Sequence, residues 1–428
     1  MIRIMKYGEE PNSVIFQRST ATADVSAAVA EIIGAVRAEG DAALRRFEEQ
    51  FDHVRLDALE VTPSELEAAM AAVTPEFLGV LERSAANIRA YHSKQLRAGY
   101  IMTQQPGLVV GQRVIPLERV GICVPGSGSG TPLASTVLMN AVPAKLAGCG
   151  EVLMVTPAMP DGTVSPAILA AAKLAGVDRV FKLGGAQAVA ALAYGTESVP
   201  KADKIVGPGG AFVAEAKKQV FGQVAIDMIA GPSEILVVSD GKSDPRYLAA
   251  DLLSQAEHDK NAAAVLVTDS MALARAVQEE IEAQLPLLKR AEIARASVEN
   301  NGKIIVAEDL RSVIAIANEI APEHLELCLD DPFDFLEEIR HAGSVFLGRS
   351  CPEAMGDYCA GPNHTLPTGG TARFSSPLSV DDFVKKSQYI YYTREAQAAA
   401  AEDVALFAEV EGLTGHARSA LIRREVET

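Results

Sequence analysis

Apolar residues in the first quarter of the chain recur at helical spacing. The stretch TADVSAAVAEIIGAVRAEG, residues 22–40, shows this spacing between a Thr/Asp start and a Gly stop. PSELEAAMAAV and the stretch from Pro75 to about Gln95 follow the same pattern. Residues 24–98 are therefore expected to be helical. The first twenty residues carry no strong pattern and are expected to form an arm.

Short apolar runs alternate with helical segments between residues 119 and 239. The runs RVGICV, EVLMVTP, RVFKLGG, KIVGPGG and SEILVVSD are predicted strands or strand ends. A segment from about Pro132 to Ala147, together with PAILAAAKLAG, AQAVAALAYG and AFVAEAKKQVFG, supplies the helices between them. Near-continuous apolar strands that alternate with helices are typical of a doubly wound parallel sheet.

The alternation restarts at residue 244 and ends near residue 378. YLAADLLSQAEHD, MALARAVQEEIEAQL and LRSVIAIANEIA are predicted helices, and AAAVLVTD, KIIVAED, HLELCLD and GSVFLG are predicted strands. Two such series predict an α/β protein with two doubly wound, Rossmann-like but incomplete parallel-sheet domains. The expected boundaries are an N-terminal arm (1–20), a first domain (21–121 with 235–378), a second domain (122–234) and a helical tail (379–428). No strand is expected after Ser379.

Composition and charge limit the partners and the compartment. The 428 residues are 48% hydrophobic and carry a net charge of −17, so neither a nucleic-acid backbone nor an anionic membrane is expected as the main partner. The N-terminus lacks the apolar core of a signal peptide, and no apolar run is long enough to cross a bilayer. Five cysteines are an odd number without a disulfide-like framework, which favours a reducing cytoplasm.

The stretch APEHLEL, residues 321–327, places Glu323 and His324 side by side behind Pro322. Such a pair is either a buried polar accident or the acid/base machinery of an enzyme. Adjacent residues on an extended strand point in opposite directions. Both side chains can therefore reach one substrate only if the strand begins after His324 and not before Glu323.

Three other segments contain residues that metals or ligands prefer. In LLSQAEHDK, Gln255 and His258 are three apart on a predicted helix and share a face, although a solvated helix end is the more common reading. The irregular loop 351–370 contains Asp357 and His364, which offer oxygen and nitrogen ligands. The tail segment EVEGLTGHARS contains His416, which by itself is more often structural or solvated than a ligand.

Glycine-rich turns follow three strands of the 119–239 series. They are VPGSGSGTP, LGGAQA and GPGGAF. Ligands bind at such strand ends in open parallel sheets, so a ligand crevice is expected there. The spacing of Gly126, Gly128 and Gly130 is G-x-G-x-G, which is only a weak dinucleotide fingerprint.

Taken together, seven collinear segments resemble the histidinol dehydrogenase family over nearly the whole chain. They are GGAQAVAALAYGTESVPKADKI, AIDMIAGPSEILV, DLLSQAEHD, APEHLEL, AGSVFLG, GDYCAGPNHTLPT and EGLTGHA. The resemblance implies a zinc-dependent, NAD-linked homodimer with shared active sites. It also implies oxidation of L-histidinol through L-histidinaldehyde to L-histidine with two NAD, the last steps of histidine biosynthesis.

The resemblance implies a role for individual residues as well. It makes Glu323 and His324 the catalytic pair, with His324 as the base and Glu323 as the activator of water. It places one Zn²⁺ per subunit and puts Gln187 at a position that contacts NAD. The zinc ligands are Gln255, His258, Asp357 and, from the neighbouring subunit, His416. The substrate contacts are Ser233, Gln255, His258, His324, Asp357, His364, Glu411 and His416, with Glu411 also from the neighbouring subunit.

Departures from the family pattern cluster at the presumed NAD crevice. Cys123 stands where the family usually has a Tyr that contacts NAD, and Gly210 stands where it usually has Asn. The loop after Pro125 is longer than usual by about two residues. We therefore expect rearranged NAD contacts, with glycine amides of residues 126–131 replacing lost side-chain donors. Two alternatives are a relative that oxidises another polar alcohol, such as a sulfonated propanediol, and a zinc-binding protein without catalysis.

Overall fold

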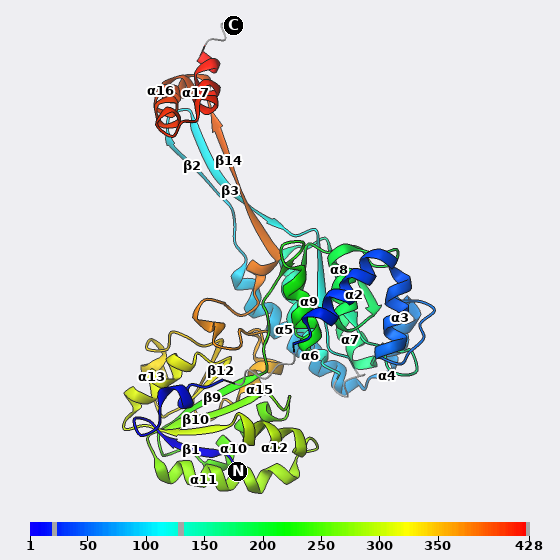
Figure 1. Cartoon of the computed structure of the whole chain (residues 1–428), viewed down its shortest axis with the longest axis vertical. Helices are drawn as coiled ribbons and strands as arrows, with labels where there is room; N and C mark the ends of the chain where they lie inside the picture. The colour runs from blue at the N-terminus through cyan, green and yellow to red at the C-terminus, as the bar shows by residue number, and fades with distance from the viewer. Residues whose placement is uncertain (19–23, 127–131, 425–428) are drawn as a thin grey trace. The chain divides into compact units, whose positions relative to one another are not determined.

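The computed structural model describes residues 1–18, 24–126 and 132–424, and it divides the chain into two compact units. Unit 1 comprises residues 1–95 and 117–383, and it contains both parallel sheets. Unit 2 comprises residues 96–116 and the segment that starts at Val384. Figure 1 labels many of the helices and strands of both units.

The first sheet of unit 1 has six parallel strands in the order β1-β11-β10-β9-β12-β13. Its strands are β1 (Arg3–Lys6), β9 (Glu234–Ser239), β10 (Ala263–Thr268), β11 (Lys303–Val306), β12 (His324–Cys328) and β13 (Ser344–Leu347). One face packs on α10 (Pro245–Ala256), α11 (Met271–Gln284) and α12 (Ala291–Asn300). The other face packs on α13 (Leu310–Ile320) and on the short α1 (Asn12–Ile15). Figure 1 shows α10 to α12 on one side of this sheet and α13 on the other.

The second sheet of unit 1 has five parallel strands in the order β6-β5-β4-β7-β8. They are β4 (Arg119–Cys123), β5 (Glu151–Thr156), β6 (Arg179–Lys182), β7 (Lys204–Val206) and β8 (Ala225–Ile226). Helices α2 (Ser26–Glu39), α3 (Asp41–Phe51), α8 (Gly185–Tyr194) and α9 (Ala211–Val220) share one core with it. Helix α6 (Ala134–Ala147) also packs on this sheet, and it contacts α5 (Pro75–His92) and α7 (Pro166–Ala175), which in turn contacts α4 (Pro63–Ala72).

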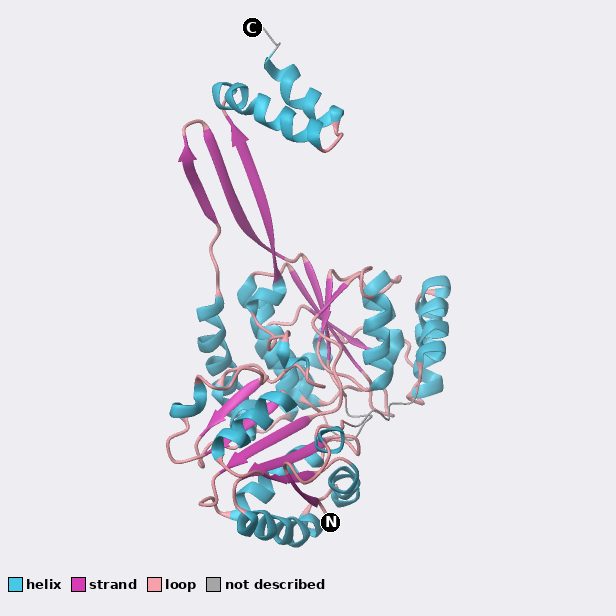
Figure 2. Ribbon diagram, turned by 60° about the vertical axis from the view of Figure 1, so that its left-hand side comes forward, coloured by secondary structure: helices cyan, strands magenta, loops and turns pink. Residues whose placement is uncertain are grey.

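Unit 2 is a three-stranded antiparallel sheet followed by two helices. The strands are β2 (Tyr100–Gln105), β3 (Leu108–Pro116) and β14 (Val384–Tyr392), with β3 in the middle. The helices α16 (Arg394–Val410) and α17 (Thr414–Leu421) pack on each other. Figure 2 shows the three long strands of this sheet in magenta. Only three alanines of the two helices form a buried cluster, so the unit has a very small core of its own.

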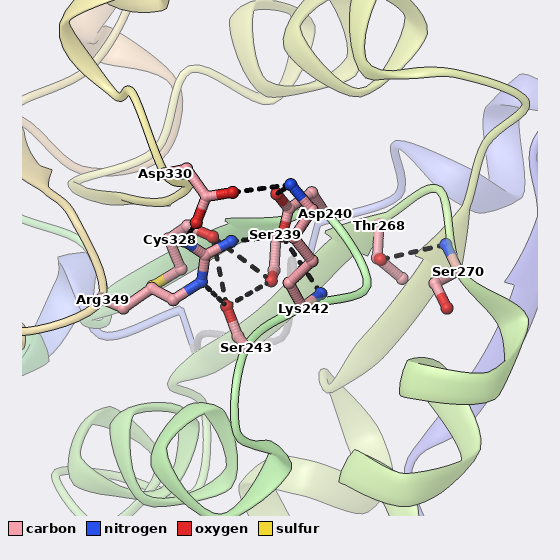
Figure 3. A network of polar contacts seen from close by, with 9 residues as sticks. All are labelled: Ser239, Asp240, Lys242, Ser243, Thr268, Ser270, Cys328, Asp330 and Arg349. Carbon is pink, nitrogen blue, oxygen red and sulfur yellow. Dashed lines mark hydrogen bonds and ion pairs between the residues drawn. The ribbon is translucent and has the colours of Figure 1, made fainter.

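A polar network occupies the carboxyl end of the six-stranded sheet (Figure 3). Arg349 forms ion pairs with Asp240, after β9, and with Asp330, after β12. Its Nε donates to the Ser243 hydroxyl over 3.0 Å, and that hydroxyl donates to the carbonyl of Cys328 over 3.2 Å. Because ligands of parallel sheets usually bind at this end, the network fills the position where a ligand would first be sought.

The predicted α/β class with two parallel sheets and a helical C-terminal part is confirmed. The expectation that no strand follows Ser379 is wrong, because β14 spans Val384–Tyr392. The segment expected as an arm contains β1, which pairs with β11. Helices α2 and α3, which the sequence analysis grouped with residues 235–378, share a core with the five-stranded sheet. Within the described part of the chain, none of the helices has the length and apolar character that a membrane span requires.

Candidate active site

A polar pocket in unit 1 lies where the amino ends of β9 and β12 meet the carboxyl end of β7. We call it the reaction pocket. From the six-stranded part it is lined by Ser233, Gln255, His258, Glu323, His324, Asp357, Tyr358 and His364, and from the five-stranded part by Thr136, Gly207, Pro208, Asp227 and Met228, among others. All seven residues of unit 1 that the sequence assigned to zinc, substrate or catalysis therefore line one pocket.

The chain turns sharply just before Glu323. Ala321 ends α13 in the left-handed conformation, with φ 48°, and the ring of Pro322 fixes the backbone φ of the residue just before Glu323. Strand β12 then begins at His324, one residue earlier than predicted, while Glu323 stays outside it. The turn brings both side chains to the same pocket, which a continuous strand would not do.

The tautomer of His324 follows from its hydrogen bond. Its Nδ1 lies 3.0 Å from the carbonyl oxygen of Glu234, and a carbonyl only accepts, so Nδ1 carries the proton. In the neutral ring, the lone pair is therefore on Nε2. This atom is buried, has no hydrogen-bond partner of good geometry among the described residues, and lies 3.4 Å from Asp357 Oδ1. Only the neutral form of the ring can accept a proton at this nitrogen.

Glu323 is fixed by the same residue, Glu234, as His324. Its Oε2 accepts a hydrogen bond of 2.8 Å from the backbone N–H of Glu234 and lies 3.6 Å from His324 Nδ1. Burial raises the pKa of Glu323 to about 8, although the nearby His324 opposes this shift. Burial disfavours a charged His324 ring, but Glu323 and Asp357 outweigh it and raise the pKa of His324 to about 10, so Nε2 must lose a proton before it can act as a base.

Gln255 and His258 come from the end of α10. The helix ends at Ala256, so Gln255 is in its last turn, and His258 lies just beyond the helix rather than on it as predicted. The backbone N–H of His258 donates to the carbonyl of Gln255 over 3.1 Å, which keeps the two residues together after the helix ends. The Gln255 side chain is buried, and its Nε2 has no partner within the described ranges.

Asp357 lies in the short helical turn η4 (Gly356–Ala360). His364 follows in the same loop, and its Nδ1 donates to the carbonyl of Asp357 over 3.1 Å. Burial lowers the pKa of both His258 and His364, so both rings are neutral near pH 7. Burial opposes the ionisation of Asp357, but the hydrogen bond and charge of His324 outweigh it and lower the pKa of Asp357.

Glu353, in the short helix α15 (Glu353–Met355), is a site residue that the sequence analysis missed. Its carboxylate lies with ligand atoms of His324 and Asp357 in a group whose members are all within 4.8 Å of one another. Burial and the neighbouring Asp357 raise the pKa of Glu353. In the sequence, the only sign that the Glu353 carboxyl belongs to the site was the composition of the loop 351–370.

His416 and Glu411 belong to unit 2. His416 is in the first turn of α17, and Glu411 caps the end of α16. Both residues are exposed to solvent.

Comparisons with known proteins show which family this chain belongs to. Residues 16–424 match the histidinol dehydrogenase family. A curated histidinol dehydrogenase of Syntrophotalea carbinolica is 56% identical over 97% of this chain and 96% of its own, and one of Clostridium acetobutylicum is 50% identical over 99% of both chains. The chain belongs to the histidinol dehydrogenase family. The crystal structure of the histidinol dehydrogenase of Elizabethkingia anophelis superimposes with a TM-score of 0.93, at 36% identity, over 99% of this chain and 98% of that chain.

A second pocket of this histidinol dehydrogenase family member lies at the carboxyl ends of β4 to β7. We call it the glycine crevice. Its lining includes Cys123, Gly126, Pro157, Gly184, Gly185, Pro208, Gly209 and Gly210. The lining is mostly small and apolar, and Pro208 lines the reaction pocket as well. Cys123 and Gly210, two of the residues predicted at the cofactor, are therefore part of it.

Gln187, the third residue predicted at the cofactor, is not among the lining residues of the glycine crevice. Its side chain is buried, and its Nε2 donates over 3.0 Å to Glu48 of α3. The same carboxylate oxygen accepts from the backbone N–H of Gly184 over 3.2 Å. Most of the loop expected to supply glycine amides, residues 127–131, lies outside the described residues.

Proposed function

We propose that this chain oxidises L-histidinol through L-histidinaldehyde to L-histidine, with two NAD as hydride acceptors. The observation that carries the proposal is the geometry of His324 in a chain of this family. Its Nδ1 is committed to the Glu234 carbonyl, and its unpartnered Nε2 lies in a pocket that adjoins a glycine crevice. Oxidation of an alcohol needs such a base, because the hydroxyl proton must leave as the hydride departs.

His324 and Glu323 divide the work in this proposal. His324 Nε2 takes the proton of the alcohol and later that of the hydrate. Glu323 takes a proton from the water that adds to the aldehyde, using the carboxylate oxygen that does not accept from Glu234. A base works best when its pKa lies near the working pH, and burial raises the pKa of Glu323 toward that range.

Zinc fits the reaction pocket by its donors. We assign Gln255, His258 and Asp357 as ligands, with His416 of the partner subunit as the fourth. Neutral imidazole and carboxylate are ordinary zinc ligands, and Gln255 is buried in the pocket with a carboxamide whose Nε2 has no hydrogen-bond partner among the described residues. When bound, zinc orients a substrate that chelates through its imidazole and amine, and it takes no part in the redox chemistry. Ser233 and His364, with Glu411 of the partner subunit, are the further substrate contacts in this proposal.

The group formed by His324, Glu353 and Asp357 is a competing metal site. A metal-bound imidazole nitrogen cannot accept a proton, so His324 cannot be both ligand and base through Nε2. Zinc content of purified variants separates the two assignments. We expect His258→Ala to lose zinc and Glu353→Gln to keep it, and the reverse pattern would favour the competing site.

The glycine crevice is the proposed NAD site. Its position at the carboxyl ends of parallel strands is the usual one for a dinucleotide, and its small side chains allow the backbone to approach a cofactor closely. Cys123 and Gly210 line the crevice, but neither has a long side chain that could donate a hydrogen bond to the cofactor. Gln187 would contact NAD only if its carboxamide turned from Glu48 into the crevice.

We propose a homodimer in which unit 2 of each subunit completes the site of the other. The helices of unit 2 expose large apolar side chains, including Phe407 at 70% and Val410 at 83% exposure. Its sheet does the same with Ile101 and Ile390. Exposed apolar surface on a unit with so small a core is typical of a protein interface. His416 and Glu411 lie in this unit, which accords with a shared site.

An initial-rate assay tests the proposed activity. Purified protein with zinc and NAD is expected to form NADH with L-histidinol and none with a sulfonated propanediol. Turnover of the sulfonated alcohol alone would instead support the relative with another substrate. Bound zinc without turnover of either alcohol would leave a zinc-binding protein without catalysis.

A further inference from the structure

The turn after β7 separates the two pockets and is shared by them. Gly207 and Pro208 line the reaction pocket, while Pro208, Gly209 and Gly210 line the glycine crevice. Gly207 has φ +103°, and a Cβ atom there would lie 2.3 Å from the carbonyl oxygen of Cys123. The backbone of the turn therefore packs closely against the end of β4, and this leaves little room for the turn to shift toward that strand.

A buried ion pair holds this turn at both the backbone N–H and the backbone carbonyl of Gly207. Asp227, just after β8, accepts from the backbone N–H of Gly207 over 2.8 Å. Lys217, on α9, donates from Nζ to the carbonyl oxygen of Gly207 over 2.9 Å. The two side chains also form an ion pair with each other, and they are only 2% and 1% exposed.

Asp227 also accepts a hydrogen bond through its other carboxylate oxygen. Its Oδ1 accepts from the backbone N–H of Met228 over 2.6 Å, and Met228 lines the reaction pocket. Lys217 lies in the second half of α9, the helix that begins directly after Gly210. The pair thus connects the turn with the helix that follows it and with the segment after β8.

We propose that Lys217 and Asp227 are positioning residues. They hold the turn 207–210 so that the cofactor and the substrate are aligned for hydride transfer. This inference rests on the proposed function, since it assumes NAD in the glycine crevice and the alcohol in the reaction pocket. Neither side chain touches the reacting atoms in this proposal. Asp227 lines the reaction pocket as well, but the effect of the pair is transmitted through Gly207 to Pro208, which lines both pockets.

Hydride transfer is sensitive to such positioning. A displacement of reacting groups by about 1 Å can lower a rate by about 10²-fold. Replacing a buried ion pair by apolar residues of similar volume is often neutral for stability, because the desolvation cost of both charges disappears. The double variant Lys217→Met/Asp227→Leu therefore removes the hold on Gly207 without leaving an unpaired buried charge.

The matched control is Lys204→Met/Asp382→Leu. Lys204 lies at the amino end of the same strand, β7, and its Nζ is 2.8 Å from Asp382 Oδ1. Both side chains are largely buried, at 11% and 26% exposure, and neither residue lines either pocket. The control repeats the chemical change in the same sheet without touching the turn.

The experiment compares kcat, KM for NAD, zinc content and the deuterium isotope effect. The isotope effect uses L-histidinol deuterated at the carbinol carbon. We expect Lys217→Met/Asp227→Leu to fold with zinc bound, to lose about 10²-fold in kcat and to show a larger isotope effect. A smaller change in the KM for NAD would distinguish misalignment from loss of the cofactor site. A kcat within about twofold of the control variant would overturn the proposal.

A second variant keeps the test decisive if the first does not fold. Lys217→Gln/Asp227→Asn keeps polar side chains, but glutamine is one atom shorter than Lys217, and asparagine has one accepting oxygen where Asp227 uses two. The hold on Gly207 is therefore weakened, and a loss in kcat in the same direction is expected. If both variants fail to fold while the control folds, the pair is a stability element and the positioning role is refuted. Inactive wild-type enzyme would refute the proposed function, and this inference with it, whereas an active wild type with a fully active variant refutes this inference alone.

Discussion

Glu48 gives a prediction about stability that depends on pH. Its side chain, on α3, is fully buried beneath the glycine crevice and accepts hydrogen bonds from Gly184 and Gln187 at one oxygen. Burial raises the pKa of Glu48 to about 8, and the nearby Asp52 adds to the shift. The folded protein therefore keeps the proton on Glu48 at pH values where the unfolded chain, with an ordinary carboxyl pKa, has lost it.

The sign follows from this difference in bound protons. Because the unfolded state binds fewer protons than the folded state between the two pKa values, the free energy of unfolding falls as pH rises from about 5 to about 8. One proton changes this free energy by about 1.4 kcal/mol for each pH unit. Glu48→Gln keeps a neutral, hydrogen-bonding side chain and removes the titration, so this contribution to the slope disappears.

Urea unfolding followed by circular dichroism at pH 6 and pH 7 measures the effect, since the chain has no Trp. The stability of Glu48→Gln relative to wild type is expected to rise by about 1.4 kcal/mol between these two pH values. The control is Glu49→Gln, the same change at the next residue of α3, whose side chain is 51% exposed. A difference between Glu48→Gln and wild type that does not change with pH, or that changes in the opposite direction, would refute the reasoning.

Three further predictions concern the active site. His324→Asn is expected to lower the rate of the first oxidation by about 10²- to 10⁴-fold, whereas Glu323→Gln should slow mainly the oxidation of added L-histidinaldehyde; equal losses in both half-reactions would contradict the division of roles. Chelation of zinc is expected to abolish NADH formation and added Zn²⁺ to restore it, and activity that survives verified metal removal would exclude a role for zinc. Mixing the inactive variants His258→Ala and His416→Ala, after subunit exchange, is expected to restore activity, because one site of each mixed dimer has every ligand intact. No recovery in dimers shown to be mixed would argue against a shared site.

Hydrophobic patterning predicted the two parallel sheets because their strands are buried on both faces. Strands β5 and β9 read as continuous apolar runs, and each has five fully buried residues out of six. Strands β2 and β14 were missed for the opposite reason. Every residue of β2 and all but one of β14 are exposed, so neither strand has a buried face to impose alternation.

The sequence indicated which residues belong to the active site, but it did not indicate which atoms they contact. The left-handed Ala321 that turns the chain before Glu323 has no signal in the sequence, because Gly or Asn is the usual residue at such a cap. Likewise Gln187 meets Glu48, 139 residues earlier in the chain, in a hydrogen bond that no local pattern could indicate. Long-range pairings of this kind are set by packing rather than by neighbouring residues.

The most direct test of the account is a count of NADH. Purified enzyme with zinc, excess NAD and a limiting, known amount of L-histidinol is allowed to react to completion. The account predicts two NADH for each L-histidinol consumed, with L-histidine as the product and no free aldehyde. One NADH with released aldehyde, or no NADH at all, would contradict a four-electron oxidation in this pocket.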